Sequence, residues 1–365
     1  MRDTPHFSVL LILVAGIGDF VMATPAIRAV RNGHPQARLH LLTSSEAAVI
    51  ARRHPGVDRV FAFPIREMRR GRLPLGAIVR VIGELRRTTY DIAANLYPVC
   101  SRAGSLKMGL LFACLKARVK AGHAVGWAGV GLDRRLPGDV FAGRHRVETM
   151  MAIARAVGGR PVGARLEIRA VDHAAAWERL VASHASGTGM RVGINPGGDR
   201  PNRRWPASRF IEVARDLAGR CGATIVVFGG PGEEEAIAGR IADALDGAAV
   251  NLAGRLGLEE LPYFLSRCDL LISNDSGPMH IAAAMQVPVV AIFGPEDANV
   301  FKPYVSPQRC RVLQHDVDCR PCARQDCSHP ICLDGISAAS VSEAALQLLG
   351  MTQSDAPRGE SSWRA

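Results

Sequence analysis

Short apolar runs recur along the chain, and most are followed by a turn and then by apolar positions at helical spacing. Residues 9–14 are a continuous run of leucine and β-branched residues, which predicts a strand covered on both faces of its sheet. A turn follows at 16–19, and residues from about 20 to 32 have helical periodicity. Pro25 fits this helix if it lies in the first turn. A second strand is predicted at 38–42.

The alternation continues through two series, which a looser region separates. The first series has further strands at 57–61 and 92–95, and residues between the strands, including the basic stretches 66–87 and 102–120, are expected to be helical. The second series ends in a helix at about 341–349, and its strands are predicted at 191–195, 224–228, 250–252, 270–273 and 289–293.

Alternation of strand and helix, repeated twice, predicts an α/β protein with two doubly wound parallel-sheet domains. We place an N-terminal domain at 1–170, a C-terminal domain at 186–350 and a disordered, polar tail at 351–365. A chain of 365 residues with 48% hydrophobic content is long enough for two cores. Ligands of such sheets sit at the carboxyl ends of strands, so the turns after the strands are where chemistry is expected.

The net charge of +11 is unevenly distributed along the chain. Residues 1–165 contain 26 Lys and Arg against 10 Asp and Glu, a net charge of +16, whereas residues 166–365 contain 19 against 24, a net charge of −5. A basic half favours an anionic partner such as a phosphorylated glycolipid or a membrane surface, with a solvated basic surface as the alternative. Aromatic content of only 5% and the lack of a nucleic-acid-binding motif argue against nucleic acid.

The cysteine content and the apolar runs bear on location. Nine cysteines are an odd number, and Cys100, Cys114, Cys221 and Cys268 are scattered through the chain; so many unpaired thiols favour the reducing cytoplasm. No apolar run approaches the ~18–20 residues that span a bilayer. Residues 9–15 resemble the core of a signal peptide but lack a small-residue cleavage site, so a buried strand explains them better.

The first turn, Gly16-Ile17-Gly18-Asp19, resembles a dinucleotide-binding fingerprint but is not one. Val21 stands where the third glycine belongs, and the second strand ends in Leu-Thr-Ser rather than in an acid. What remains is a carboxylate at the start of a helix. Asp19 is then either a helix N-cap or a general base, which the helix N-terminus would keep ionised.

The second turn, residues 195–199, is Asn-Pro-Gly-Gly-Asp, and Arg203 and Arg204 follow it. Gly197 and Gly198 allow backbone N–H groups to approach an anion closely, and two guanidiniums offer charge-assisted bonds to phosphate. The combination suits a diphosphate leaving group; the alternative is a surface turn before a helix.

The third turn, residues 274–280, is Asn-Asp-Ser-Gly-Pro-Met-His, directly after a predicted strand. A proline in the first helical turn leaves the other N–H groups pointing outward, where a phosphate or ribose would lie. The candidate binding residues here are Asp275, Ser276, Gly277 and His280. Glu233, in an acidic helix start after Gly229-Gly230, is a candidate ribose ligand or a solvated residue.

A late cysteine cluster has the spacing Cys319-x2-Cys322-x4-Cys327-x4-Cys332, with His329 inside it. The first pair has a spacing that suits a structural zinc site, but the second pair is looser. Buried or redox-sensitive thiols are the default interpretation.

The order and spacing of these motifs resemble glycosyltransferase family 9, the ADP-heptose:lipopolysaccharide heptosyltransferases. The resemblance covers nearly the whole chain and rests on Gly18-Asp19 with Thr24-Pro25, on Pro196-Gly197 to Trp205-Pro206, on Gly229-Gly230, on residues 274–280 and on the late cysteine-rich segment. It implies a GT-B architecture, in which two Rossmann-like domains face each other across a cleft. The N-terminal domain would take the acceptor and the C-terminal domain the nucleotide-sugar.

The resemblance also implies an inverting, metal-independent transfer that needs no cofactor. Asp19 matches the proposed base, Arg203 replaces the lysine that often contacts the diphosphate, and Ser276 replaces a frequent threonine. The donor would be ADP-heptose and the acceptor an anionic glycolipid, Kdo-lipid A or core oligosaccharide. Gly18, Arg102 and Lys107 are candidate acceptor contacts, the last two with exposed basic residues as the alternative. Peripheral contact with the inner membrane is a further expectation.

Two other functions fit parts of the pattern. A nucleotide-sugar epimerase can share the architecture but would not need a strongly basic acceptor domain. A non-enzymatic nucleotide-binding protein could keep the donor loop while losing Asp19, and this chain keeps both.

Overall fold

The computed structural model describes residues 7–69, 71–99, 101–124, 129, 131–137, 143–184, 189–322, 324 and 327–350. The chain divides into two compact units, Met1–Arg169 and Ala170–Ala365. The tail expected at 351–365 lies outside the described residues. Residues 171–185, which the predicted domain bounds left between two domains, belong to the second unit, and so does Ala170.

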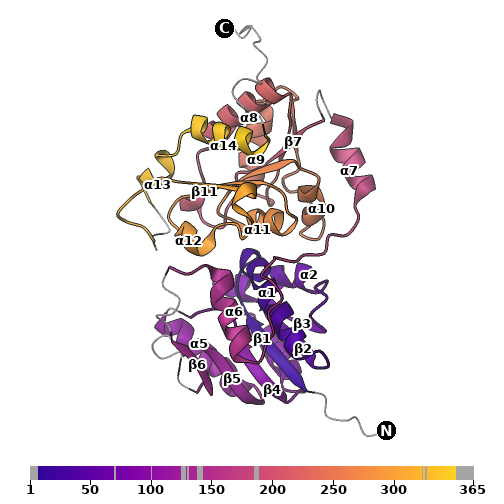
Figure 1. Cartoon of the computed structure of the whole chain (residues 1–365), viewed down its shortest axis with the longest axis vertical. Helices are drawn as coiled ribbons and strands as arrows, with labels where there is room; N and C mark the ends of the chain where they lie inside the picture. The colour runs from indigo at the N-terminus through magenta and orange to yellow at the C-terminus, as the bar shows by residue number, and fades with distance from the viewer. Residues whose placement is uncertain are drawn as a thin grey trace. The chain divides into compact units, whose positions relative to one another are not determined.

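Each unit is a parallel sheet with helices on its faces (Figure 1). In the first unit the described strands are β1 (Ser8–Leu13), β2 (Arg38–Ser44), β3 (Arg59–Phe63), β4 (Tyr90–Asn95), β5 (Ala117–Ala124) and β6 (Arg134–Pro137). The helices are α1 (Ile17–Gly33), α2 (Ser45–Ala51), α3 (Ile65–Arg69), α4 (Leu75–Leu85), α5 (Arg102–Cys114) and α6 (Arg146–Ala156).

The second unit repeats the alternation. Its described strands are β7 (Arg191–Asn195), β8 (Thr224–Val227), β9 (Ala249–Asn251), β10 (Leu270–Asn274), β11 (Val289–Phe293) and β12 (Cys310–Gln314). Its helices are α7 (Ala174–Leu180), α8 (Ala207–Cys221), α9 (Glu233–Asp243), α10 (Leu261–Ser266), α11 (Gly277–Ala284), α12 (Ala298–Phe301), α13 (Ile331–Asp334) and α14 (Ala338–Leu348), with 3₁₀ turns at Ala182–His184, Pro201–Arg203 and Pro307–Arg309.

The two sheets have the same topology, which confirms the prediction of two doubly wound domains. Among the described residues the strand orders are β3-β2-β1-β4-β5-β6 and β12-β11-β10-β7-β8-β9, and every neighbouring pair is parallel. The chain reverses its direction across the sheet between β1 and β4 in one unit and between β7 and β10 in the other. These switch points are where an open sheet of this kind binds ligands, beyond the carboxyl ends of the strands.

Helix α1 begins earlier than the periodicity indicated, and this corrects the expectation for Pro25. The helix starts at Ile17, so Pro25 lies inside it rather than in its first turn. A proline has no N–H to donate to the carbonyl four residues earlier, here that of Val21. The Thr24 hydroxyl donates to this carbonyl instead, at 2.7 Å, which compensates for the missing backbone bond.

Helices α4 and α5 cover one face of the first sheet. Both helices contribute to one hydrophobic cluster with strand residues such as Leu10 and Ile12, through Leu85 of α4 and Phe112 of α5. Helices α1 and α6, which contribute no residue to this cluster, contact each other (Figure 1). The stretch 102–120, expected to be helical throughout, is helical only to Cys114, because residues 117–120 belong to β5.

Residues that follow α6 run back along α1 and close the first unit. The Glu167 carboxylate forms an ion pair with Arg28 at 3.1 Å. The Glu167 backbone N–H donates to the Thr24 hydroxyl at 2.9 Å. Arg165 accepts a further bond from Arg28 through its carbonyl. The first unit therefore extends to Arg169, close to the predicted bound of its domain at residue 170.

The second sheet is packed on one side by α8 and α14, which share one hydrophobic cluster with β7, β8 and β10. Trp205 anchors the segment before α8: it is buried, its indole N–H donates to the Ile336 carbonyl at 3.1 Å, and its ring meets Phe210 edge to face. None of the helices in the described part of the chain is both long and apolar enough to cross a bilayer.

Candidate functional site

The predicted binding turns of the second unit meet at its switch point. Asn274, at the end of β10, donates to the carbonyls of Pro196 and Gly197, at 2.8 and 3.2 Å, and accepts from the Trp205 N–H. Asn195, at the end of β7, donates to the Ser276 hydroxyl at 2.9 Å. Two buried asparagines thus fix the loop after β7 against the loop after β10, which brings the second and third motifs together.

Arg203 lies between carboxylates from two other loops. Its guanidinium is 3.4 Å from Asp275, in the loop after β10, and pairs also with Glu296, in the loop after β11. Glu296 pairs in addition with Arg200. Asp275 and Glu296 therefore fix the position of the guanidinium, while about a quarter of the Arg203 side chain remains exposed. An oriented guanidinium with spare N–H groups is suited to a phosphate oxygen.

Arg204 also has partners within the second unit. Its Nε donates to the Gly198 carbonyl at 3.0 Å, and its terminal nitrogen lies 2.8 Å from Glu233. Glu233 is mostly exposed, so this ion pair is weak and leaves the carboxylate accessible to a ligand. The prediction that both arginines and Glu233 belong to one site is compatible with this geometry.

The amide groups of the two glycine turns are bridged by Glu234, the neighbour of the predicted ligand Glu233. The Glu234 carboxylate accepts from the N–H of Gly198 at 3.0 Å and from that of Gly230 at 2.7 Å. A Cβ at Gly197 would lie 2.5 Å from the Glu234 carboxyl carbon, so a larger residue here would displace the Glu234 carboxylate. Glu234 ties the loop after β7 to the loop after β8.

Helix α11 begins where the sequence predicted. Ser276 is its N-cap residue, Gly277 its first residue, and Pro278 sits in the first turn. The Ser276 hydroxyl donates to the Asn274 carbonyl at 3.1 Å and so stays within the turn. His280 is buried one turn inside the helix. The first-turn N–H groups of a helix have no partners within it, which favours an anion at this end.

Asp19 occupies the third position of α1, after β1 of the first unit. Gly16 is the N-cap residue, and its N–H donates to the Asp19 carboxylate at 3.1 Å. The N-cap residue is therefore Gly16 and not Asp19, which was the alternative interpretation. The Asp19 side chain nevertheless caps the start of the helix from the third position. Asp19 and Gly18 are both partly exposed.

The candidate acceptor contacts Arg102 and Lys107 both lie on α5 and are exposed. Arg102 is the first residue of that helix, after the capping Ser101. Their exposure agrees with either of the two interpretations given above, and their role remains a prediction.

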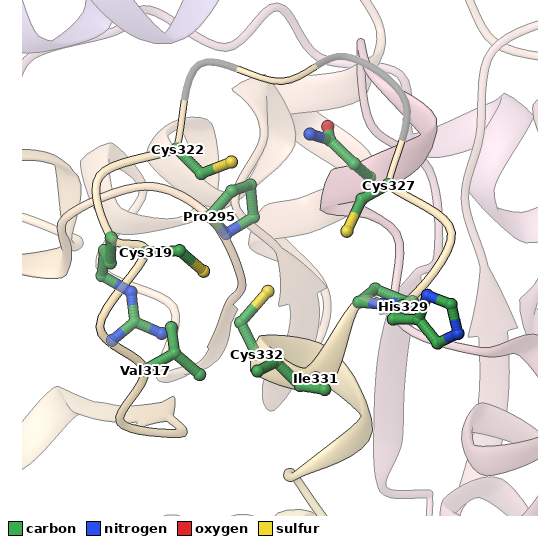
Figure 2. Close-up of a pocket in the computed structure, with 11 residues that line it drawn as sticks. Pro295, Val317, Cys319, Cys322, Cys327, His329, Ile331 and Cys332 are labelled. Carbon is green, nitrogen blue, oxygen red and sulfur yellow. The ribbon is translucent and has the colours of Figure 1, made fainter.

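The late cysteines line a small cavity in the second unit (Figure 2). Cys319, Cys322, Cys327 and Cys332 surround about 30 Å³ of space, enough for a water molecule or an ion and far too little for a nucleotide. Within the described residues no three histidine, cysteine or acidic side chains are placed to hold one metal ion. Burial raises the pKa of the Cys332 thiol, which disfavours its thiolate form.

This cysteine-rich segment is hydrogen-bonded to the loops that carry Arg203 and Glu296. The Cys322 N–H donates to the Pro295 carbonyl at 2.9 Å, and the Arg320 side chain donates to the Gly294 carbonyl at 3.0 Å. Asn202, next to Arg203, donates to the Arg324 carbonyl. The segment therefore positions the backbone on either side of the Arg203–Glu296 pair.

Sequence reasoning missed Glu296, Arg200 and Glu234. Glu296 lies in the turn that follows the buried strand β11, so the rule that directed attention to the other turns could have found it. Glu233 and Glu234 are adjacent glutamates at the start of α9, and the sequence alone does not show which of them faces the glycine turns.

Comparisons with known proteins agree with this picture. The chain matches the family model described as glycosyltransferase family 9 (heptosyltransferase) over residues 78–332. It is 28% identical to lipopolysaccharide heptosyltransferase 2 of Salmonella typhimurium over 327 residues, 84% of this chain and 87% of that protein.

Two solved structures share the fold. The ADP-heptose heptosyltransferase II of Escherichia coli has a TM-score of 0.71 at 22% identity, covering 94% of this chain and 98% of the other. The E. coli heptosyltransferase WaaC with ADP-2-deoxy-2-fluoro heptose has a TM-score of 0.66 at 20% identity, covering 85% and 94%. The predicted GT-B type of fold is thereby confirmed.

Proposed function

We propose, from the premise that the chain belongs to glycosyltransferase family 9, that it transfers heptose from ADP-heptose to the inner core of lipopolysaccharide or a related surface glycan. The observation that carries the proposal is the oriented Arg203 at the switch point of the second unit, between Asp275 and Glu296. The names of the Salmonella relative and of the E. coli structures support the donor and the acceptor class. Membership of a transferase family favours transfer over epimerisation.

The second unit would bind the donor. Arg203 would contact the diphosphate, and the N-terminus of α11, with Gly277 and the nearby His280, would receive an oxygen of the phosphate or ribose. Glu233 would accept from a ribose hydroxyl by exchanging its weak contact with Arg204. These groups stabilise the negative charge that grows on ADP as the sugar leaves, which is the largest contribution expected in such a site.

The reaction would be a single displacement with inversion. An acceptor hydroxyl oxygen forms a bond to the anomeric carbon, while the bond from that carbon to the β-phosphate oxygen breaks and ADP leaves with the electron pair. The hydroxyl proton passes to the Asp19 carboxylate. Gly16 already donates to one Asp19 oxygen and thereby orients the carboxylate. We expect the first unit, with Gly18, Arg102 and Lys107, to hold the acceptor.

The acceptor and the location follow from charge and thiols. The first 165 residues carry a net charge of +16, which suits the phosphates and carboxylates of Kdo-lipid A or core oligosaccharide. The described cysteines are free thiols, in keeping with a cytoplasmic enzyme. We propose that the reaction requires neither metal nor cofactor, because arginine, histidine and helix N–H groups supply the stabilising charge.

Nucleotide binding by calorimetry tests the donor assignment. We expect ADP to bind more tightly than UDP, GDP or CMP, and we expect Asp19→Ala to bind ADP as the wild type does. Preference for UDP would overturn the ADP-sugar assignment and favour the epimerase alternative. Binding of ADP without turnover of ADP-heptose and acceptor would favour the non-enzymatic alternative.

A further inference from the structure

Helix α4 has more apolar surface than its sheet covers. Val81, Ile82 and Leu85 face the hydrophobic cluster under the helix. Leu75 and Val79, one turn apart along the edge of the same apolar stripe, are 61% and 68% exposed. Leu73, just before the helix, is 62% exposed. Exposed aliphatic side chains that gather on one element mark an interaction surface more often than scattered ones do.

Helix α5 shows the same excess. Phe112 is buried, and Met108 and Leu111 pack partly against the cluster. Leu106 and Leu110, again one turn apart, are 66% and 60% exposed. Since α4 and α5 pack on the same cluster and the same face of the sheet, their exposed leucines and valine lie on the outer side of one layer.

Basic residues lie next to these aliphatic residues in the sequence. Residues 66–87 contain seven arginines and two glutamates, and residues 102–120 contain five lysines and arginines and no acid. The exposed members nearest in sequence to the aliphatic side chains are Arg72, Arg80, Arg102 and Lys107. A net charge of this size opposes pairing with a second copy of the same surface but suits an anionic partner.

We propose that this surface, defined by Leu73, Leu75, Val79, Leu106 and Leu110 with Arg72, Arg80, Arg102 and Lys107, docks on an anionic lipid bilayer. The aliphatic side chains enter the boundary between headgroups and acyl chains, and the guanidinium and ammonium groups pair with headgroup phosphates. Amphipathic helices with leucine on one face and basic residues beside it bind membranes in this way. The inference rests on the proposed function, because a lipid-linked acceptor requires the enzyme at a membrane surface.

Sedimentation of the full-length protein with lipid vesicles tests the proposal. Vesicles of phosphatidylcholine alone are compared with vesicles that also contain phosphatidylglycerol, at low salt. We expect binding only to the anionic vesicles. The double variants Leu75→Ser/Val79→Ser and Leu106→Ser/Leu110→Ser should each weaken binding roughly tenfold or more. Val162→Ser, at an exposed apolar residue elsewhere in the first unit, is the matched control and should bind as the wild type does.

The charge contribution is tested with Arg80→Glu, against Arg155→Glu on α6, which is also exposed. Arg80→Glu should weaken binding several-fold and Arg155→Glu far less. Circular dichroism verifies that each variant is folded. Equal binding of wild type and both aliphatic double variants, absence of wild-type binding to anionic vesicles, or dimers that the serine variants dissociate would each overturn the proposal.

Activity on a delipidated, water-soluble acceptor separates this inference from the proposed function. The serine variants should transfer sugar to that acceptor at the wild-type rate and lose activity only on acceptor embedded in anionic vesicles. Loss of activity on both acceptors would overturn the docking role. If the wild type binds vesicles but turns over neither acceptor, the proposed function fails while the docking surface stands.

Discussion

The guanidinium of Arg203 lies 3.4 Å from the Asp275 carboxylate, although the two residues belong to loops that follow different strands of the second sheet. Glu296, from a third loop, completes the arrangement. A cation held by two carboxylates is oriented before a ligand arrives, and such preorganisation lowers the cost of binding. We therefore expect Asp275 and Glu296 to set the direction of the Arg203 guanidinium in the proposed donor site.

The first prediction concerns this arrangement. Arg203→Ala should weaken ADP binding about ten- to a hundredfold, the equivalent of one or two charge-assisted hydrogen bonds. Asp275→Asn should weaken it less, since the guanidinium stays but loses one of its partners. Calorimetry on both single variants and the double variant measures the coupling. Additive losses would contradict the idea that Asp275 acts through Arg203.

Asp19 should affect chemistry and not donor binding. Asp19→Asn keeps an oxygen that can accept from the Gly16 N–H but cannot take a proton, so folding should be nearly unchanged. We expect kcat to fall by about two to four orders of magnitude, with ADP affinity as in the wild type. Steady-state kinetics measures kcat, and calorimetry measures the affinity for ADP. A similar loss in ADP affinity would instead place Asp19 in donor binding.

Glu234 should stabilise the second unit. Glu234→Ala leaves the N–H groups of Gly198 and Gly230 without the carboxylate, and we expect a loss on the order of 2 kcal/mol in the free energy of unfolding. Urea unfolding, followed by the fluorescence of buried Trp205, measures it. Glu212→Ala, at an exposed position on α8, is the control and should stay within about 0.5 kcal/mol of wild type. Equal stability of both variants would refute the bridging role.

Stability of the first unit should fall in mild acid. Burial lowers the pKa of His54 to about 4, against the opposing charge of Glu167, and its Nδ1 accepts from the Gly56 N–H. The unfolded chain binds this proton below about 6.5, while the folded unit resists it down to about 4. Between these values the unfolded state binds more protons, so stability is lost as the pH falls, by on the order of 3 kcal/mol.

His54→Asn retains an acceptor for Gly56 and removes the titration. Burial lowers the pKa of His123 to about 4 as well and also lowers the pKa of His40, so the variant should lose a part of the pH dependence and keep the rest. Hydrogen exchange of β1 amides between pH 4 and 7, corrected for intrinsic rates, measures the change. An unchanged slope in His54→Asn would show that other groups control acid stability.

The sequence predicts the strands that are covered on both faces, and also the edge strands β3 and β9, but it misses β5, β6 and β12. β1, β10 and β11 are buried throughout, β7 is buried except at Arg191, and all four contain apolar runs. β6 and β12 lie at the edges of their sheets and are only partly buried, and β5, beside β6, contains Arg118 and Lys120. Partial cover allows polar residues, so the apolar signal is lost.

The site divides in a similar way. Turns after buried strands could be found from glycine, proline and asparagine, because backbone chemistry restricts those residues. Ion pairs such as Arg204 with Glu233, or Arg203 with Glu296, depend on how loops from different strands approach each other. That approach is set by the asparagine bonds at the switch point, which only the folded unit reveals.

Release of ADP from ADP-heptose, measured with and without a Kdo-lipid A acceptor, tests the central claim most directly. The account predicts ADP release that requires the acceptor, forms one new glycosidic bond of inverted anomeric configuration for each ADP, and is lost in Asp19→Asn. Release of ADP that is independent of the acceptor, or a product of retained configuration, would contradict it.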